Sequence, residues 1–348
     1  MKKENQTRRG QLRGYIFEVV IRKLLSMNGF EQIVDMIPNK VKIHGVNNIE
    51  IKGRGTWHQI DCPCIYKKTV PFIHDIRLLA EIKFHTSEIQ KDKIRQYIGV
   101  MKDISENYFI DEINTIENQK KYTDIGVFFA ANGFQIEAEK LAFAHGIKTI
   151  SYKNNEIVQK IKDNITLLES DYLSANKCIS KDNQNSFMSK IAYILDNPIS
   201  ERLFIEFEEE FMPENGYRDY LIEIRNELQQ IHTSFFGITE TNYFIHFLSK
   251  ARFPSNLFSE TDTMSCRVFY VNSQNFYITI NGDDQNRRFY FSAPEKLIRK
   301  VLTDREGIID EKGRHFNKIT VSIELNGILR NLSLHIDRDW LNRLAREI

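Results

Sequence analysis

The sequence has few cysteines, and their spacing fits neither a disulfide framework nor a zinc site. Cys62 and Cys64 are separated by one residue, and Cys178 and Cys266 stand alone, so we expect buried free thiols. The apolar runs fall short of the about 20 residues that a membrane helix needs. The N-terminal segment MKKENQTRRG lacks the apolar core of a signal peptide. These absences predict a cytoplasmic protein with no membrane partner.

Two other kinds of site are also missing. The histidines His58, His74 and His85 are scattered and lack the ligand spacing of a zinc site. The turn at Gly133 is not followed by the Gly-Lys-Ser/Thr of a phosphate-binding loop, so nothing indicates a nucleotide. Any metal site must therefore be sought among carboxylates.

Length and composition indicate an ordinary soluble protein of two domains. The chain has 348 residues, of which 41% are hydrophobic and 27% are charged. The polar stretch Ser174–Ser186 marks a change in composition. We therefore predict one domain over residues 1–175 and a second over residues 186–348.

The two halves differ in charge. Residues 1–160 carry 25 Lys and Arg against 19 Asp and Glu, a balance of +6, whereas residues 161–348 carry 23 against 28, a balance of −5. A basic half fits an electrostatic footprint for phosphate, and DNA is the partner it suggests.

The segment Gly53–His85 is the most informative stretch. It predicts a strand over His58–Tyr66 that carries Asp61, followed by a strand over Ile76–His85. In the second strand, alternation places Glu81 and Lys83 on one face, since successive side chains point to opposite sides. Two carboxylates suit a hard cation such as Mg²⁺, and a lysine can position or activate water or balance charge during phosphodiester cleavage.

This short pattern has a second interpretation. An Asp followed later by Glu-x-Lys is common at protein surfaces, where it forms a solvated strand face with an incidental ion pair. The context favours the site: Asp61 lies in an apolar strand after a Gly-x-Gly turn, and Glu81 and Lys83 end a strand whose other face is apolar.

The stretch GRGTWHQID followed by AEIK resembles the PD-(D/E)xK nuclease superfamily, and particularly its Mrr-like restriction endonuclease branch. Residues 13–30 are similar to the first helix of that fold, and residues 124–152 to its closing strand–helix–strand, so the resemblance covers roughly residues 10–155. Two departures stand out. Ile60 precedes the aspartate where proline is common, and Cys-Pro-Cys follows it, so Pro63 predicts a bulge or an edge position.

The resemblance implies an α/β fold with a restriction-endonuclease-like mixed sheet flanked by helices. It also implies Mg²⁺, with Mn²⁺ able to substitute, bound by Asp61, Glu81 and the carbonyl of Ile82. Lys83 would position or activate the attacking water. Glu18, on the first helix, would add a ligand or orient one through water; otherwise it is an exposed glutamate that pairs with Arg22.

Five further residues are candidates for substrate binding. Gln59 shares the parity of Asp61, the loop after the first strand carries two adjacent lysines, and the helix predicted over Ser87–Ile104 would pack beside the site. The candidates are Gln59, Lys67, Lys68, Lys91 and Gln96. Alternatively, Gln59 bonds only to the backbone, Lys67 and Lys68 belong to an ordinary surface loop, and Lys91 and Gln96 lie on a solvated helix face.

The remaining elements of the first half follow from periodicity. A helix is predicted over Arg13–Asn28 after a frayed arm, short strands over Val41–Ile43 and Ile49–Ile51, and a polar insertion over residues 105–122. A strand, a helix over Gln135–His145 and a strand over Ile147–Tyr152 form a β-α-β unit, which implies a parallel or mixed sheet.

The second half predicts an α+β C-terminal domain. Helices are expected over Phe187–Leu195, Glu201–Phe211 and Arg218–His232, after Pro294 and from Asp339. Strands are expected over Cys266–Val271, Phe276–Asn281, Arg288–Ser292, Thr320–Leu325 and Leu329–Ile336. The last two strands are joined by Asn326-Gly327, a hairpin signal. Phe289, Tyr290 and Phe291 could stack on bases, but core packing is the favoured interpretation.

These observations predict a metal-dependent DNA endonuclease, in prokaryotic restriction or anti-phage defence. The C-terminal domain would recognise the target, bind a protein partner or activator, or form a homodimer, by analogy with other nucleases. Two alternatives remain: a structure-selective nuclease such as a junction resolvase, and a non-catalytic nuclease fold that binds nucleic acid or a partner.

Overall fold

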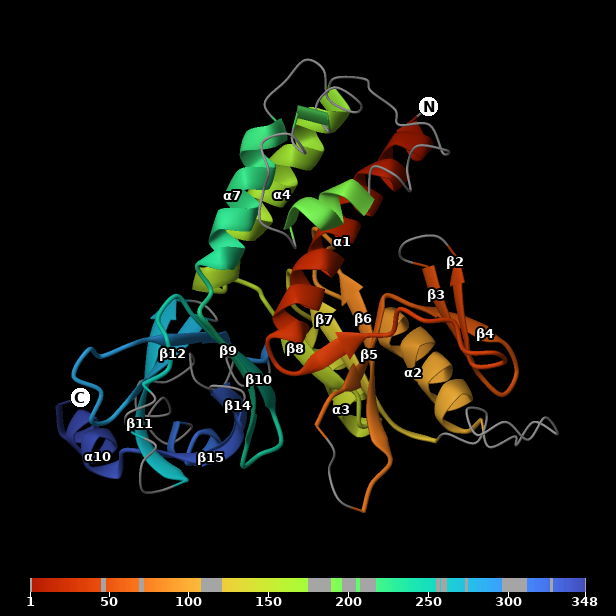
Figure 1. The fold of residues 1–348 in the computed structure, drawn as a ribbon. Coiled ribbons are helices and arrows are strands. Elements are labelled where there is room, and N and C mark those ends of the chain that lie inside the picture. Colours follow the sequence, from red (N-terminus) through yellow and green to blue (C-terminus); the bar gives the residue numbers. More distant parts are fainter. Residues whose placement is uncertain are drawn as a thin grey trace.

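The chain forms a mixed α/β structure with a mixed five-stranded sheet, a small three-stranded sheet and a closed seven-stranded β-barrel (Figure 1). The computed structural model describes residues 2–44, 48–68, 72–107, 121–174, 189–195, 205–206, 217–254, 257, 262–272, 275–295, 312–325 and 328–347. Most of the predicted boundary stretch Ser174–Ser186, from residue 175 on, and residues 108–120 of the insertion predicted over residues 105–122 lie outside these ranges.

The five-stranded sheet holds the segments that the sequence analysis singled out. Its strands, in spatial order, are β1 (Phe30–Gln32), β5 (Cys62–Tyr66), β6 (Asp75–Lys83), β7 (Tyr122–Ala130) and β8 (Lys148–Ser151). The pairs β1–β5 and β5–β6 are antiparallel, whereas β6–β7 and β7–β8 are parallel. Helix α3 (Ile136–Ala144) connects β7 to β8, which confirms the predicted strand–helix–strand unit.

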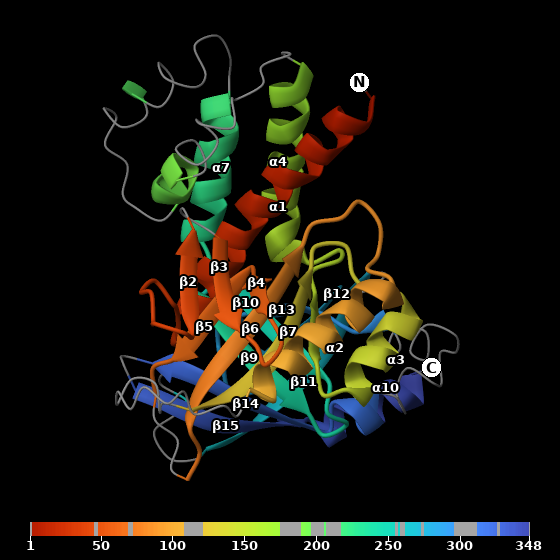
Figure 2. The ribbon, with the colours of Figure 1, turned by 90° about the vertical axis from the view of Figure 1, so that its right-hand side faces the viewer.

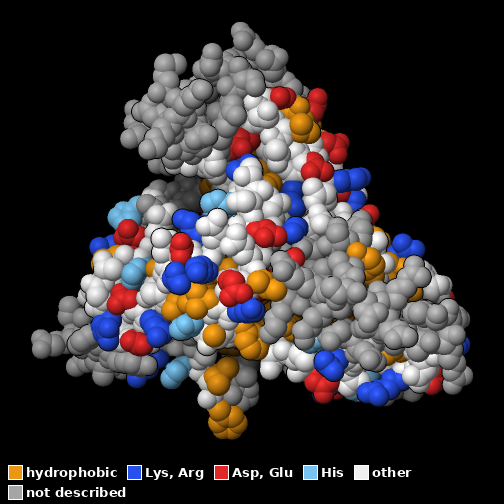
Figure 3. All heavy atoms as spheres, turned by 180° about the vertical axis from the view of Figure 1, so that it is seen from behind, with side chains coloured by type: hydrophobic (Ala, Val, Ile, Leu, Met, Phe, Trp, Pro, Cys, Tyr) orange, Lys and Arg blue, Asp and Glu red, His pale blue; other side chains and the backbone are white. Residues whose placement is uncertain are grey.

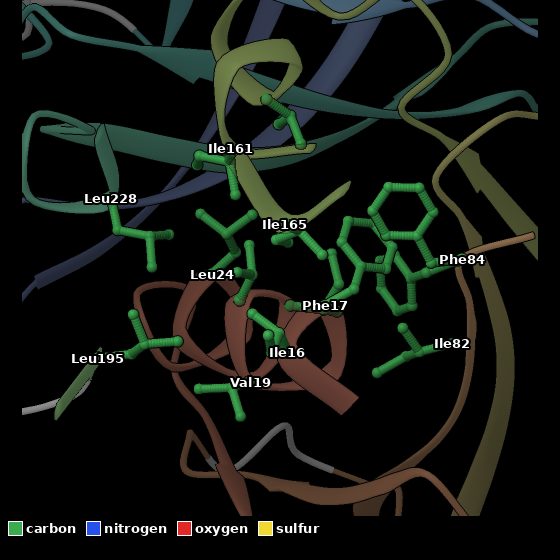
Figure 4. Packing of buried hydrophobic residues seen from close by; sticks show 14 of the residues in the cluster. Ile16, Phe17, Val19, Leu24, Ile82, Phe84, Ile161, Ile165, Leu195 and Leu228 are labelled. Carbon is green, nitrogen blue, oxygen red and sulfur yellow. The ribbon is translucent and has the colours of Figure 1, made fainter. Parts of the chain in front are cut away.

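One face of this sheet packs against α1 (Lys2–Ser26). Helix α4 (Glu156–Ser174) packs on α1, and α7 (Tyr217–Gln229) packs on α4 (Figure 2). Figure 4 shows Ile16 and Phe17 of α1 among Ile161 and Ile165 of α4 and Phe84, which follows β6. The apolar side of β6 therefore packs against helices, as its alternation predicted.

Helix α1 begins at Lys2, so the frayed arm predicted before Arg13 is wrong. Leu12 is buried, and the Arg13 amide and guanidinium both contact the Glu169 carboxylate on α4. These contacts stabilise α1 at the residue where the helix was predicted to begin. The Lys, Glu, Gln and Arg residues before it have high intrinsic helix propensity, so the helix extends toward the N-terminus.

The other face of the sheet is covered by α2 (Lys91–Ser105), α3 and the three-stranded sheet of β2 (Val41–His44), β3 (Asn48–Lys52) and β4 (Trp57–Ile60). The strand predicted over His58–Tyr66 is therefore two strands, β4 and β5, in two different sheets. The chain breaks at Asp61, whose side chain accepts the Ile82 amide hydrogen of the neighbouring strand. A period-2 pattern does not reveal that break, because both pieces keep the alternation.

Pro63 causes neither a bulge nor an edge, in contrast to the prediction. It lies inside β5, between β1 and β6, opposite Leu79. Its carbonyl accepts the amide hydrogen of Ile33, just beyond the end of β1. In a strand the N–H and C=O of one residue point to the same side, so the donor that proline lacks would face the end of β1, not β6.

The C-terminal region forms a closed β-barrel, whereas the sequence analysis predicted an α+β domain without specifying a barrel. Its strands, in chain order, are β9 (Thr233–Thr239), β10 (Phe244–Ser249), β11 (Thr263–Asn272), β12 (Asn275–Ile280), β13 (Phe289–Ser292), β14 (Lys318–Leu325) and β15 (Ile328–Ile336), followed by α10 (Arg338–Glu347). The sequence analysis missed β9 and β10. These two strands close the barrel by pairing with β14 and β13.

Phenylalanines fill the barrel interior. Phe289 and Phe291 are fully buried among Phe235, Phe247 and Phe276. Core packing is therefore confirmed for Phe289 and Phe291, which are closed to bases. One apolar tip lies outside any core: the loop between β5 and β6 carries fully exposed Phe72 and projects from the lower edge in Figure 3.

Candidate active site

Asp61, Glu81 and Lys83 meet at one end of the β5–β6 pair. The register pairs Cys62 with Ala80, so extending it by one residue sets Asp61 opposite Glu81. The Lys83 ammonium lies 2.7 Å from Asp61 Oδ2 and 2.7 Å from Glu81 Oε1. The structure thus brings together the three residues on which the prediction depends, from two adjacent strands.

The backbone of β6 fixes the Asp61 carboxylate. The Ile82 amide donates a hydrogen bond to Asp61 Oδ2 over 2.8 Å. Ile82 itself is buried on the opposite, α1-facing side. The contact places the Ile82 peptide beside the carboxylates, and a metal role for its carbonyl remains a prediction.

Glu18 joins this group from α1. Burial raises the pKa of Glu18 well above its usual range, and the charge of Asp61 adds to the effect. Burial, followed by the charge of Asp61, likewise raises the pKa of Glu81. The charges of Asp61, Glu81 and Lys83 therefore act on a third carboxylate, Glu18.

Lys83 is held as an ammonium by its neighbours. Burial disfavours its charged form, but the carboxylates of Asp61 and Glu81 outweigh burial, so the pKa of Lys83 is raised above its usual value. Lys83 can thus donate hydrogen bonds and offset negative charge. It has no lone pair with which to remove a proton while the two carboxylates hold it.

The residues fit a magnesium ion in part. Mg²⁺ is commonly bound by one or two carboxylates together with waters, and Asp61 and Glu81 supply two at the same strand ends. Within the part of the chain that the structure describes, no three His, Cys, Asp or Glu side chains converge as a ready-made ligand cage. The surplus of negative charge over Lys83 is the feature that a divalent cation would neutralise.

Cationic groups border the site beyond those predicted. Burial lowers the pKa of His85. The charges of Lys93, Lys83 and Arg13 lower it further. The Arg13 Nε donates to the Phe84 carbonyl over 2.9 Å. Arg13, His85 and Lys93 were not among the candidates, because only the fold brings the middle of α1 and the start of α2 to the end of β6.

The predicted substrate-binding residues divide into two groups. Gln59, on β4, and Lys91 and Gln96, on α2, are exposed on elements that adjoin the site. Lys67 and Lys68 follow the opposite end of β5, where they pair with Glu31 and Glu324. The structure does not bring these two lysines to Asp61.

The thiols described by the structure are free, as expected. Cys62, Cys64 and Cys266 are buried, and the Sγ atoms of Cys62 and Cys64 are 3.4 Å apart. Cys178 lies outside the described residues. Among the described helices, none is long and apolar enough to cross a membrane.

No family model matches the chain, and no curated protein matches it. Among solved structures, it is similar to the crystal structure of a protein of unknown function, AF1548, with 17% sequence identity and a TM-score of 0.32. The match covers 62% of this chain and 96% of that chain. A TM-score this low carries no argument, so the function must be argued from the residues of this chain.

Proposed function

We propose that this chain is a metal-dependent endodeoxyribonuclease of the PD-(D/E)xK type, with a restriction-endonuclease-like sheet. The observation that carries the proposal is the placement of the Lys83 ammonium 2.7 Å from both Asp61 and Glu81 at paired strand ends. A third carboxylate, that of half-buried Glu18 on α1, is subject to the same charges, which supports the proposal.

Each residue has a distinct role in this proposal. Asp61 and Glu81, with the Ile82 carbonyl, would hold Mg²⁺ or Mn²⁺, which when bound supplies Lewis-acid stabilisation of the phosphate and lowers the pKa of a bound water. Lys83 would donate hydrogen bonds to the attacking water or to a phosphate oxygen. Glu18 would accept a hydrogen bond from a water in the same space.

The charges fit the reaction. Hydrolysis forms a P–O bond from water and breaks the P–O bond to the leaving sugar oxygen, so negative charge accumulates on the phosphate and the leaving group. Lys83 lies among the carboxylates, and Arg13, His85 and Lys93 border them. The charged groups of Arg13 and Lys93 can hold the flanking phosphates of a DNA strand, whereas His85, whose pKa is lowered, is a neutral neighbour.

The proposed setting is prokaryotic restriction or anti-phage defence in the cytoplasm. The barrel would serve target recognition, a protein partner or activator, or a homodimer. A structure-selective nuclease is the second candidate, favoured by the outer face of the small sheet β2–β3–β4, which carries Trp57, Lys42 and Lys52.

Cleavage of supercoiled and linear plasmid with Mg²⁺ or Mn²⁺ tests the proposal. Wild type should cut both, EDTA should stop it, and Lys83→Ala should lower the rate by about 100- to 10,000-fold, because the reacting phosphate loses its nearest cation. Lys68→Ala is the matched control, since Lys68 lies at the far end of β5 and should cut as wild type does.

Either of two results would overturn the assignment. Equal cutting by Lys83→Ala and wild type would mean that the site lies elsewhere. Failure of wild type to cut plain, branched or modified DNA with either metal would support a non-catalytic binding protein.

A further inference from the structure

The three-stranded sheet β2–β3–β4 is anchored beside the candidate active site by its inner face. Val41, Ile49, Ile51 and Ile60 are buried there against Leu79 of β6. Leu79 precedes Glu81 by two residues and so shares its face of β6. The last residue of β4, Ile60, is followed at once by Asp61, so the small sheet continues directly into the site.

The outer face of the small sheet carries one aromatic ring between two lysines. The register sets Lys52 opposite Trp57 on β4, and Lys42 lies on β2, two strands from β4. The Lys42 ammonium is 4.0 Å from the Trp57 ring centroid and the Lys52 ammonium is 5.3 Å from it. The Trp57 side chain is half-buried and Lys42 is exposed, so the ring is supported by its neighbours and still reachable from solvent.

The rest of this face is polar. Gln59 is exposed two residues before Asp61, and it lies opposite Glu50, which in turn lies opposite Lys42. Glu50 is the carboxylate on this face, and His44 Nε2 lies 3.3 Å from its Oε2. The face therefore combines two lysines, an amide and an indole ring, with one carboxylate that already has a partner.

This combination matches what binds single-stranded nucleic acid. Such sites pair cations that follow the phosphates with aromatic rings on which bases stack, and stacking needs a base whose face is open. In an intact duplex the base faces are covered by neighbouring pairs. The small sheet lies on the side of the five-stranded sheet away from the barrel (Figure 1), so the barrel does not cover this face.

We propose that the outer face of β2–β3–β4 binds an unpaired DNA strand next to the cleavage site, with Trp57 stacked on a base and Lys42 and Lys52 on the adjoining phosphates. The proposal rests on the nuclease function and deepens it, because it assigns the preferred substrate class: DNA with a single-stranded segment. Four residues of strand separate Trp57 from Asp61, about 13 Å. The duplex rise of about 3.4 Å per phosphate is the shortest spacing along a strand, so the stacked base lies at most about four nucleotides from the cut.

The fluorescence of Trp57 tests the proposal without any cleavage. The chain has two tryptophans, so Trp340→Phe leaves Trp57 as the sole emitter. This variant is titrated in EDTA with three probes: a single strand of about 12 nucleotides, a blunt duplex of about 12 base pairs, and the same duplex with an overhang of about six nucleotides. Each single-stranded segment is long enough to span the distance from Trp57 to Asp61. The single strand and the overhang should quench the emission, and the blunt duplex should not.

Affinity measurements with labelled versions of the same probes separate the groups. Trp57→Leu should bind the single strand about 5- to 100-fold more weakly, whereas Trp57→Phe, which keeps a ring, should recover most of the affinity. Lys42→Ala with Lys52→Ala should reduce the slope of log K against log salt by about 1.4, the share of two phosphates. Lys318→Ala with Arg330→Ala, which removes two exposed cations from the barrel strands, is the matched control and should change neither value.

The outcomes distinguish this inference from the proposed function. Unchanged Trp57 emission and equal affinity of Trp57→Leu, in a protein that cuts DNA, would overturn the inference and leave the nuclease standing. Equal quenching by the blunt duplex would overturn the choice of an unpaired strand. Quenching by the single strand in a protein that cuts no DNA would support strand binding by β2–β3–β4 and contradict the nuclease function. Thermal unfolding of Trp57→Leu at the wild-type temperature shows that the variant is folded.

Discussion

Two groups of polar side chains border the five-stranded sheet, and they differ in how their charges are balanced. At one end of β5–β6, Asp61 and Glu81 both pair with Lys83, and their charges act on Glu18, so carboxylates outnumber the ammonium. The Asp61, Glu81 and Lys83 side chains remain partly exposed, with 12%, 21% and 26% of their areas accessible. This group is open to solvent and to ions.

The second group joins the sheet to the barrel and is neutral. Tyr152, after β8, hydrogen-bonds His246 Nδ1 over 2.6 Å, and Ser234 Oγ lies 2.8 Å from His246 Nε2. Asn28, after α1, donates to the same Ser234 oxygen over 2.8 Å. His246 and Tyr152 are almost fully buried, and burial lowers the pKa of His246 to about 3.

The first group keeps a surplus of negative charge, whereas the second is neutral, and the proposed function assigns the chemistry to the first alone. In the neutral group the hydrogen bonds satisfy one another, so its loss should be felt as unfolding. In the charged group burial, followed by the charge of Asp61, raises the pKa of Glu18 and of Glu81, and an added cation would offset the negative charge. The comparison predicts that substitutions in the two groups act on different properties.

The largest effect is expected at Glu81. Glu81→Gln keeps the shape and an oxygen for Lys83 but removes a charge from the site. DNA cleavage should fall by about 100- to 10,000-fold, while the free energy of unfolding changes by less than about 1 kcal/mol. Plasmid cleavage and urea unfolding of the same preparation measure both. A loss of stability as large as the loss of activity would abolish the distinction between the groups.

The next effect is expected at His246. His246→Phe leaves the Tyr152 and Ser234 hydroxyls buried without this partner, which should cost about 2–4 kcal/mol of unfolding free energy. The control is the double variant Tyr152→Phe with His246→Phe, which removes two partners at once. Urea unfolding should show that the double variant loses less than the two single variants added together; strict additivity would mean that the hydrogen bond contributes nothing.

The smallest effect is a difference in pH dependence. The usual pKa of histidine is about 6.5 and that of folded His246 is about 3, so between these values the unfolded chain binds the extra proton and stability falls as the pH is lowered. From pH 7 to pH 5, the wild type should lose about 2 kcal/mol more than His246→Gln, which has no proton to take up. Parallel curves of unfolding free energy against pH would show that His246 is accessible to protons when folded.

The sequence alone identified the elements around the site because their patterns are local. The alternation in β6 placed Glu81 and Lys83 on one face, and the apolar run of β7 marked a buried strand flanked by a helix. Asp61 was found by the same reading. What failed is non-local: the two halves of His58–Tyr66 keep one alternation although they pair with different strands.

The barrel illustrates the same limit. Strands β9 and β10 were missed, although their burial is nearly continuous, because a short run of aromatic and polar residues on both faces has no clear period. Barrel closure depends on β14 pairing with β9, between residues about 80 apart in the chain. Arg13 and Lys93 were likewise invisible as neighbours of His85 until the helices were placed.

Calorimetric titration with Mg²⁺ and Mn²⁺ tests the central contrast between the two groups most directly. Wild type should bind a divalent cation at one site, Asp61→Asn should lose that binding, and His246→Gln should retain it, because the surplus charge lies with the carboxylates alone. Absence of binding by wild type, with or without DNA, or unchanged binding by Asp61→Asn, would contradict the assignment of this site as the metal centre of a nuclease.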